Sequence, residues 1–367
     1  MVPRRSASVL LIPFLLAPFC LADEAAKTTA APVPQTVLQK IDEFFRPPGR
    51  PRTREEYTKM LAQYAKQMQD LLKTGEQAEG KYPKAANLHV LRVRMLEAAH
   101  FLAQYRKSDP ARKNLLAVAG RLAASAAPPK SRVQADYFVT LDKIAPSGKP
   151  PAKDAGKQIR TYVKRYGKTP AEATALIRAV DLAKKTGQTT VEKELLDTLE
   201  KDHATDGAAH LLLRRAGRRP PFYAEVSLLN GKKLSLPDGA KGKVLVVDFW
   251  AMWCPPCLVA LPHMKQLYAK YKPKGVEFLG ISLDRANSRD KLAAFIKTNQ
   301  IEWLHAYSGK YWDDPTARHY GIRGIPSVWV IGKDGRVVSD NARGNLEGVI
   351  QQALAAPAPA SGSAAKK

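Results

Sequence analysis

Cysteine is scarce in this chain of 367 residues, which contains only Cys20, Cys254 and Cys257. So few cysteines exclude a scaffold held together by several disulfides. Histidine is sparse as well, and no two histidines have the spacing of metal ligands. We therefore expect no metal site and no cofactor.

The chain also lacks a long hydrophobic run at its N-terminus. The apolar stretch at residues 9–19 is too short to span a bilayer well, and two prolines interrupt it. It follows a charged start with Arg4 and Arg5, which is typical of a secretory signal peptide. We predict a signal peptide at residues 1–22, cleaved after Ala22, and export to the periplasm or cell envelope.

Cys20 raises the question of a lipid anchor. Lipid attachment needs a small residue before the cysteine, but Phe19 stands there, so we favour cleavage over lipidation. Cleavage removes Cys20 and leaves Cys254 and Cys257 as one close pair. Such a pair in an exported chain is better suited to electron exchange than to stapling a fold.

Acidic residues are too few to balance the basic ones. The 34 Asp and Glu stand against 59 Lys and Arg, which gives a formal net charge of +25. This excess of positive charge suggests nucleic-acid binding, but the basic residues are spread over both halves and interleaved with acids. We predict no nucleic-acid partner, while attraction to anionic lipid or cell-wall polymer stays open.

The N-terminal half has a helical pattern throughout. Residues 23–35, rich in Ala, Thr and Pro, predict a linker. Apolar residues then recur at helical spacing, as in 54–73 and 87–105, and one helix is expected to start at an N-cap, Thr169. We predict an all-α helical array over 36–217, similar to a tetratricopeptide solenoid, which can dock a protein partner.

Strands are expected from residue 218 onward. The run 244–249 is almost continuously apolar and β-branched, which is typical of a buried central strand. The other expected elements are a hairpin at 223–228 and 233–236, strands 276–283, 327–331 and 336–339, and helices 255–271, 288–298 (capped by Ser288), 314–320 and 345–354. This alternation predicts an α/β domain at 218–355, followed by a disordered tail at 356–367.

Cys254 and Cys257 lie where the buried strand meets the start of the next helix. Their spacing puts both side chains on one helix face, about one turn apart. A helix N-terminus stabilises an anion, which lowers the pKa of the first cysteine and favours its thiolate. Pro255 and Pro256 fit a first turn. We therefore predict a redox pair with Cys254 as nucleophile and Cys257 as resolving thiol.

Two other interpretations of the pair stay open. It can be half of a zinc site, although a second ligand pair is missing and the near histidine, His263, follows on the same expected helix. It can also be a purely structural disulfide, although so small a loop would add little stability.

Two segments resemble the signatures of thioredoxin. Residues 244–262, which contain Trp-Cys-Pro-Pro-Cys, resemble its active-site strand and helix, and residues 321–327 resemble its second motif. The resemblance covers about 222–354. Three features are more similar to the TlpA/ResA-like exported proteins than to thioredoxin itself: the signal peptide, the Trp-Cys-x-Pro-Cys form and an insertion at 304–320. The resemblance implies a thioredoxin fold and thiol-disulfide oxidoreductase activity.

The resemblance also implies roles for matching residues. Pro326 is expected to have a cis peptide bond and to lie against the dithiol, so that Ile325 offers its backbone to an extended substrate. Asp248, on the buried strand, is expected to have a raised pKa and to exchange a proton with Cys257. The alternative is that Asp248 is an ordinary polar residue of the core.

An apolar collar is expected around the cysteine pair. Trp253 and Trp250 are its candidates, and either can instead be a packing residue. Trp253, Pro255 and Pro256 then complete the expected substrate surface next to the reactive sulfur.

Two positions depart from the family pattern. Ala260 stands where TlpA/ResA-like proteins commonly carry an acid, three residues after the second cysteine. Gly280 falls near the place of the lysine that pairs with the buried aspartate of thioredoxin. We therefore expect Asp248 to be more strongly perturbed than usual, with consequences for pH dependence rather than for the dithiol chemistry.

These predictions favour a reductase of disulfides in other exported proteins, with apocytochrome thiols as one candidate and a membrane electron donor as the source of electrons. A disulfide oxidase or isomerase on the same fold is the main alternative. A non-enzymatic alternative is a docking protein whose helical half binds a partner. A peroxidase is weaker, because the Pro-x-x-x-Thr pattern before its cysteine is absent.

Overall fold

The computed structural model describes residues 31–49, 51–240 and 242–357. The predicted signal peptide 1–22 with Cys20, most of the linker and most of the tail lie outside these residues. The chain divides into two compact units, with the border between Ala135 and Asp136. The domain border near residue 217 stays a prediction. Within the described ranges, no helix combines the length and the apolar character needed to cross a membrane.

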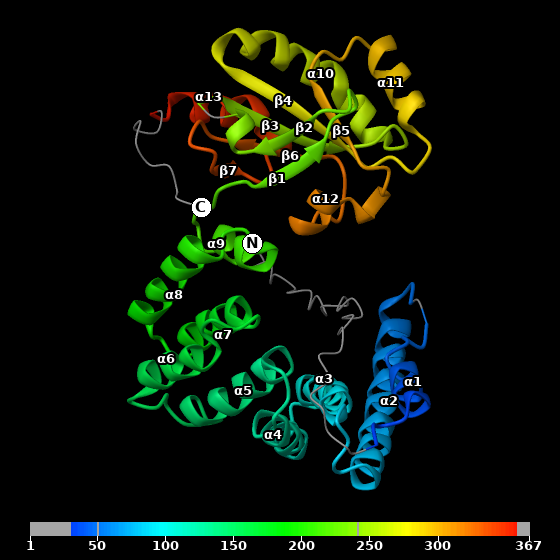
Figure 1. The fold of residues 1–367 in the computed structure, drawn as a ribbon, viewed down its shortest axis with the longest axis vertical. Coiled ribbons are helices and arrows are strands. Elements are labelled where there is room, and N and C mark those ends of the chain that lie inside the picture. The colour runs from blue at the N-terminus through cyan, green and yellow to red at the C-terminus, as the bar shows by residue number, and fades with distance from the viewer. Residues whose placement is uncertain (1–30, 50, 241, 358–367) are drawn as a thin grey trace, which may run out of the picture. The chain divides into compact units, whose positions relative to one another are not determined.

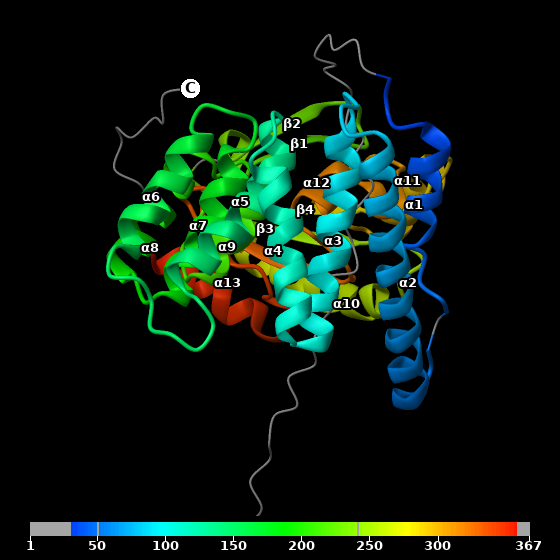
Figure 2. The same ribbon diagram turned by 90° about the horizontal axis from the view of Figure 1, so that it is seen from below.

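The first unit is helical. Its elements are α1 (Gln35–Glu43), α2 (Arg54–Lys81), α3 (Leu88–Arg106), α4 (Asp109–Ala123) and the start of α5 (Pro129–Ile144). A capping box starts α2, because the Thr53 side chain accepts the Glu56 N–H and the Glu56 carboxylate accepts the Thr53 N–H. Gly75 of α2 lets α3 come close, since a Cβ there would lie 2.7 Å from the Met95 Cγ. Figure 2 shows α2, α3 and α4 side by side.

The second unit begins with further helices. These are the rest of α5, α6 (Ala155–Tyr166), α7 (Glu172–Lys185), α8 (Thr189–Asp202) and α9 (Gly207–Arg215). Helix α6 packs on α7, α7 on α8 and α8 on α9. These elements confirm an all-helical N-terminal region. The predicted cap at Thr169 is wrong, because α7 begins later with Ala171 in the cap position. The Thr169 hydroxyl instead donates to the Tyr166 carbonyl and accepts the Ala171 N–H, which forms a turn ahead of the helix.

The remainder of the second unit is built on a five-stranded sheet in the order β5-β4-β3-β6-β7. The strands are β1 (Ala224–Ser227) and β2 (Lys233–Leu236), which form a separate hairpin, β3 (Val244–Trp250), β4 (Val276–Ser282), β5 (Leu304–Tyr307), β6 (Ser327–Ile331) and β7 (Val337–Ser339). Strands β3, β4 and β5 are parallel, and β6 and β7 are antiparallel to their neighbours.

Four helices accompany this sheet (Figure 1). They are α10 (Pro255–Tyr271), α11 (Arg289–Thr298), α12 (Pro315–His319) and α13 (Leu346–Ala355), and short 3-10 turns lie at Asp238–Ala240, Lys272–Lys274, Tyr311–Asp313 and Arg343–Asn345. This arrangement confirms the α/β thioredoxin fold that the sequence predicts.

Two local features of this part go beyond the sequence predictions. The segment 304–320, predicted as an insertion, contains the edge strand β5 at Leu304–Tyr307. Ser288 occupies the N-cap position of α11, as predicted, although its side chain makes no capping hydrogen bond. The Ser288 N–H donates to the Tyr307 hydroxyl, so β5 helps to fix the start of α11.

The side chains of the sheet divide between two faces. Tyr268 of α10 packs against Phe278 and Trp303, with ring centroids 5.3 and 5.4 Å apart. Because alternate residues of a strand share a face, Gly280 follows Phe278 and His305 follows Trp303 onto the side that α10 covers. This side is called the α10 face below.

Helix α9 lies against the opposite face. Trp329 of β6 is in register with Val247, whose side chain points away from the α10 face. The Arg214 guanidinium of α9 lies 4.4 Å from the centroid of the Trp329 ring and also pairs with Asp340. His210 of α9 is fully buried, and its ring contacts that of Trp329. The last helix before the sheet is therefore part of the same core.

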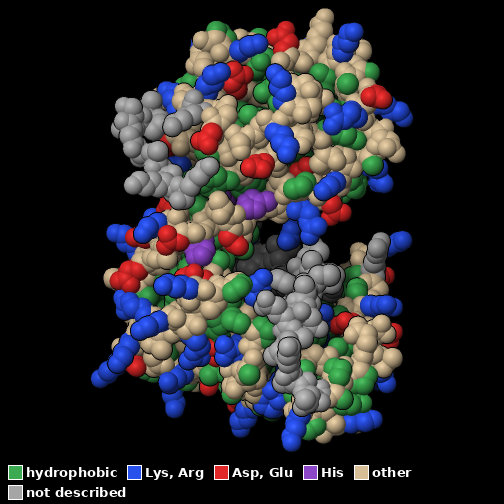
Figure 3. All heavy atoms as spheres, in the orientation of Figure 1, with side chains coloured by type: hydrophobic (Ala, Val, Ile, Leu, Met, Phe, Trp, Pro, Cys, Tyr) green, Lys and Arg blue, Asp and Glu red, His purple; other side chains and the backbone are tan. Residues whose placement is uncertain are grey.

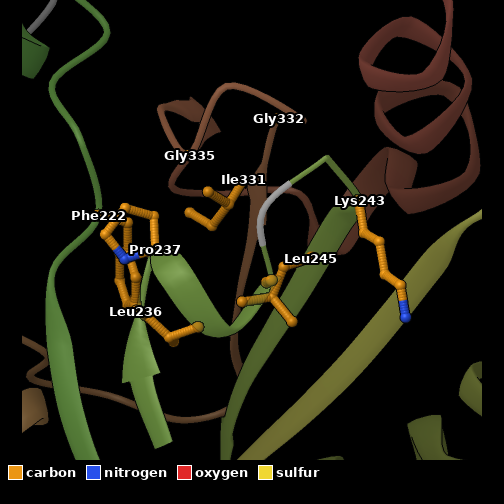
Figure 4. A pocket seen from close by; sticks show the side chains of 9 residues that line it. Phe222, Leu236, Pro237, Lys243, Leu245, Ile331, Gly332 and Gly335 are labelled. Carbon is orange, nitrogen blue, oxygen red and sulfur yellow. The ribbon is translucent and has the colours of Figure 1, made fainter. Parts of the chain in front are cut away.

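A small void remains between the hairpin and the β6–β7 turn (Figure 4). It is lined by Phe222, Leu236, Pro237, Ala240, Lys243, Leu245, Ile331, Gly332 and Gly335. Its volume of about 10 Å³ admits no more than a water molecule, so it is a gap in the packing rather than a ligand site.

Candidate active site

Cys254 stands at the start of α10. Strand β3 ends at Trp250, and a short turn follows in which the Cys254 N–H donates to the Ala251 carbonyl over 3.2 Å. Helix α10 begins at Pro255 with Cys254 in the N-cap position. Pro255 and Pro256 occupy the first turn, where no N–H partner is required. The positive end of the helix dipole therefore lies at Cys254.

Cys254 and Cys257 form a disulfide, and their Cα atoms are 5.3 Å apart. The Cys254 carbonyl accepts the N–H groups of Cys257 and Leu258 at 3.0 and 3.2 Å, so the first helical turn fixes the spacing of the pair. In this oxidised state the two cysteines are 3% and 7% exposed. Their exposure does not distinguish the attacking sulfur, and that assignment depends on the helix N-terminus.

Pro326 lies at the same end of the sheet. Ser327, the first residue of β6, is in register with Phe249 near the end of β3. Because β6 is antiparallel to β3, the segment before β6 and the turn after β3 leave the sheet together. The Ile325–Pro326 peptide bond is cis. The structure thus brings Ile325 and Pro326 to the end of the sheet that carries Cys254.

Asp248 lies on the α10 face, in register with Gly280. Its Oδ1 is buried and has no hydrogen-bond partner among the described residues. Burial raises the pKa of this carboxyl to about 7, and the charge of Arg343 opposes the rise. Asp248 therefore changes its protonation state near neutral pH. The residue paired with it on β4 is Gly280, which offers no positive charge of the kind that a lysine would supply.

The two tryptophans of the expected collar have different surroundings. Trp253 is 41% exposed, and its Nε1 donates to the Leu283 carbonyl over 3.3 Å. Its ring contacts that of Tyr311, with centroids 5.1 Å apart. Trp250 is buried, and its ring packs against Phe295 of α11. Only Trp253 of these two reaches the surface, and Trp250 belongs to the core.

Asp284 is a residue of the site that the sequence patterns do not single out. It follows β4 and is 2% exposed. Its carboxylate accepts the Met252 N–H at 3.2 Å and the Ser282 hydroxyl at 2.8 Å. Burial raises the pKa of Asp284, and these two hydrogen bonds oppose the rise. Its only signal in the sequence is its place at the carboxyl end of a parallel strand, where functional residues of α/β sheets gather.

A surface pocket of about 340 Å³ opens beside this turn. Its lining residues are Trp253, Asp284, Arg285, Ser288 and Tyr311. The Arg285 guanidinium lies 4.4 Å from the centroid of the Tyr311 ring, which orders that side of the pocket. Aromatic rings and polar groups next to the disulfide make a surface that can receive a polypeptide segment.

The described residues contain no group of three or more His, Cys, Asp or Glu side chains that could hold a metal ion. Ala260, on α10, supplies no carboxylate. The acidic residues near the active-site turn are Asp248, which lies on β3, and Asp284, which follows the end of β4.

Comparison with known proteins agrees with this chemistry. Residues 242–337 match a protein-family model described as thioredoxin-like. Thiol-disulfide oxidoreductase ResA of Bacillus cereus is 34% identical over 140 residues, which are 37% of this chain and 77% of that protein. ResA of Bacillus subtilis is 29% identical over 119 residues, 32% of this chain and 62% of that protein. Among solved structures, a thiol-disulfide oxidoreductase from Bacteroides fragilis is 27% identical, with 36% of this chain and 97% of that chain covered and a TM-score of 0.32.

Proposed function

Since the chain belongs to the ResA-like thiol-disulfide oxidoreductases, we propose that it is an exported reductase that opens disulfides in other exported proteins. The observation that supports this most strongly is the disulfide between Cys254 and Cys257 at the N-terminus of α10. Thiol-disulfide exchange needs two cysteines that can form and break a bond with each other. The described residues contain no cysteine besides this pair.

Cys254 makes the first attack. In the reduced protein, the N–H groups and dipole at the start of α10 lower the pKa of its thiol. The thiolate attacks one sulfur of the substrate disulfide, which forms a mixed disulfide and releases the other sulfur as a thiolate. Cys257 then attacks the Cys254 sulfur, closes the protein disulfide and releases the second substrate thiol. Two electrons pass to the substrate, and an electron donor at the membrane restores the dithiol.

Asp248 takes part in the second step as a proton acceptor. Cys257 must lose its proton before it attacks, and a carboxyl with a pKa of about 7 can accept that proton near neutral pH. Asp248 lies on the sheet face that α10 covers, and α10 carries Cys257. The burial that raises its pKa is what fits this acid to the task.

The substrate lies across the exposed end of the sheet. Trp253, Pro255 and Pro256 are exposed and offer an apolar surface beside the sulfurs. An extended segment runs along the backbone of Ile325, next to the cis Pro326, and one of its side chains enters the pocket beside Trp253.

Export and partners complete the proposal. The charged and apolar start of the sequence supports export to the periplasm or cell envelope. The all-helical region supports a role in docking a protein partner, and the face seen in Figure 3 shows its Lys and Arg side chains dispersed among Asp and Glu rather than joined in a stripe. Co-purification of a partner with the full chain, but not with one that begins at residue 206 and so keeps α9, would support docking.

An insulin-reduction assay with dithiothreitol tests the enzymatic proposal. The wild type is expected to precipitate insulin faster than Cys254→Ser, and equal rates would contradict the proposal. Equilibration with glutathione then separates a reductase from an oxidase or isomerase. A potential near that of thioredoxin, about −270 mV, supports the reductase, and one near about −120 mV supports an oxidase.

A further inference from the structure

Three residues form a row across the α10 face. Asp248 of β3 is in register with Gly280 of β4, and Gly280 is in register with His305 of β5. Side chains at paired positions point to the same face of a sheet. Asp248 and His305 therefore flank a residue that has no side chain, and Trp250, two residues after Asp248, lies on this face as well.

Two ring nitrogens converge over Gly280. A Cβ atom at Gly280 would lie 2.6 Å from the His305 Nδ1 and 2.8 Å from the Trp250 Nε1. The two rings also contact each other, with centroids 5.5 Å apart. Both side chains are deeply buried, His305 at 5% and Trp250 at 4% exposure. Only glycine fits at position 280, and it brings both nitrogens next to the residue across from Asp248.

These buried polar atoms are unpartnered. Within the described ranges, the Asp248 Oδ1, the Trp250 Nε1 and both ring nitrogens of His305 have no hydrogen-bond partner. Buried polar atoms of folded proteins are nearly always hydrogen-bonded, to protein or to ordered water. The set is also complementary, because the indole and a neutral imidazole each donate one N–H and a carboxylate only accepts.

The aromatic rings that contact His305 are uncharged. Burial alone lowers the pKa of His305 to about 4, so its ring is neutral at physiological pH. The rings that contact His305 or its ring neighbours are Trp250 of β3, Trp303 just before β5, Tyr268 of α10 and Phe295 of α11, and Gly280 of β4 lies beside them. The charge that acts on Asp248 comes from Arg343.

We propose that Asp248, Trp250 and His305 hold one buried water molecule between them beneath α10, and that His305 is a positioning residue that sets the proton affinity of Asp248. The row spans two strand spacings, about 10 Å between the outer Cα atoms. The side chains of Asp248 and His305 extend over part of this distance, and a single water can bridge their polar atoms. The water accepts from the two rings and donates to the Asp248 Oδ1. About three polar partners is the usual number for a buried water.

The hydrogen bond donated to Asp248 favours its carboxylate, so loss of that bond raises the pKa of Asp248. The catalytic consequence depends on the proposed function, since Asp248 accepts the Cys257 proton there. The hydrogen-bonding itself does not depend on it, and it can be measured in the oxidised protein without any substrate.

Carboxyl NMR titration of Asp248 in the full oxidised chain tests the proposal. In His305→Leu the titration midpoint is expected to rise by about one pH unit, and in His305→Gln, which keeps a donor, to return most of the way. His210→Leu is the matched control, because His210 is also fully buried with an unpartnered Nδ1 but contacts Trp329 on the opposite face. Equal midpoints in His305→Leu, His210→Leu and the wild type would overturn the proposal.

A second measurement uses the wild type alone, so its result does not depend on whether a variant folds. The ring nitrogen shifts of His305 in the wild type are expected to change at the pH at which Asp248 titrates, while those of His210 stay constant there. Flat His305 shifts through that range would overturn the proposal. Coupled shifts in a protein that does not reduce insulin would instead contradict only the proposed function.

Discussion

The carboxylate of Asp284 accepts the backbone N–H of Met252, two residues before Cys254, and thereby ties the active-site turn to the end of β4. The same carboxylate accepts the Ser282 hydroxyl, so its orientation is fixed from its own strand. The turn that presents the reactive sulfur is thus held by a buried acid just after the neighbouring strand rather than by its own residues alone.

Asp284→Ala is expected to loosen this turn. The Met252 N–H loses its acceptor, which lowers the free energy of unfolding by about 1–3 kcal/mol and slows insulin reduction. Asp284→Asn is the matched control, because its amide oxygen can still accept that N–H. Denaturant unfolding and insulin turbidity measure both effects. An alanine variant as stable and as active as the wild type would contradict the anchoring role.

Asp248 makes stability depend on pH in a direction that can be checked. Its folded-state pKa of about 7 lies above the ordinary value of 3.8, so the folded chain binds the extra proton between these values. Its contribution is fully present below the ordinary value and is lost as pH rises through the folded-state pKa. Asp248→Asn is therefore expected to be more stable than the wild type at pH 8, by about 4 kcal/mol, and little different at pH 3.5.

Thermal unfolding at these two pH values measures the effect. The wild type is expected to reduce insulin faster as pH increases through about 7, and the same substitution should remove this rise. A stability difference that does not change with pH would mean that Asp248 is not titrating near neutrality.

Arg214→Ala tests the attachment of α9 to the sheet. The substitution removes the guanidinium over the Trp329 ring and the ion pair with Asp340, with an expected loss of about 1–2 kcal/mol in the free energy of unfolding. Arg215→Ala, at the exposed neighbouring arginine, is the matched control and should change little. Reductase activity should survive both changes, because α9 packs on the face opposite α10. A large loss of activity at unchanged stability would contradict this division of the two faces.

Much of the site is predictable because its signals are local in sequence. The apolar run before Cys254 predicts β3, the spacing of Cys254 and Cys257 predicts their closeness, and Gly280 falls across from Asp248 where the resemblance to thioredoxin puts it. Each of these inferences needs only the period of one strand, one helical turn or a matched motif.

The features that sequence patterns miss depend on contacts between distant segments. Strand β5 has only four residues and buries a polar His305 in its middle, so no alternation identifies it. Asp284 is a single acid after a strand, and its partner Met252 lies 32 positions away. Ser288 is the N-cap residue of α11, as predicted, but the hydrogen bond from its N–H to the Tyr307 hydroxyl cannot be read from the sequence. In each case the deciding contact joins segments that are distant in sequence.

The acidity of Cys254 tests the effect of the helix N-terminus. In a Cys257→Ser variant, ultraviolet absorbance of the thiolate is expected to give a pKa well below about 8.5, the value of a free cysteine. The same variant in denaturant, where α10 is absent, should return to that value. Equal acidity in the folded and unfolded states would mean that α10 does not activate the sulfur.

Trapping of the mixed disulfide tests most directly the claim that Cys254 is the attacking sulfur. Reduced Cys257→Ala protein is mixed with a disulfide-bonded peptide, and the adduct is located by mass spectrometry, with Cys254→Ala as the matched control. We expect a stable adduct on Cys254 and little adduct on Cys257 in the control. No adduct on Cys254, or equal adducts in the two variants, would contradict the account.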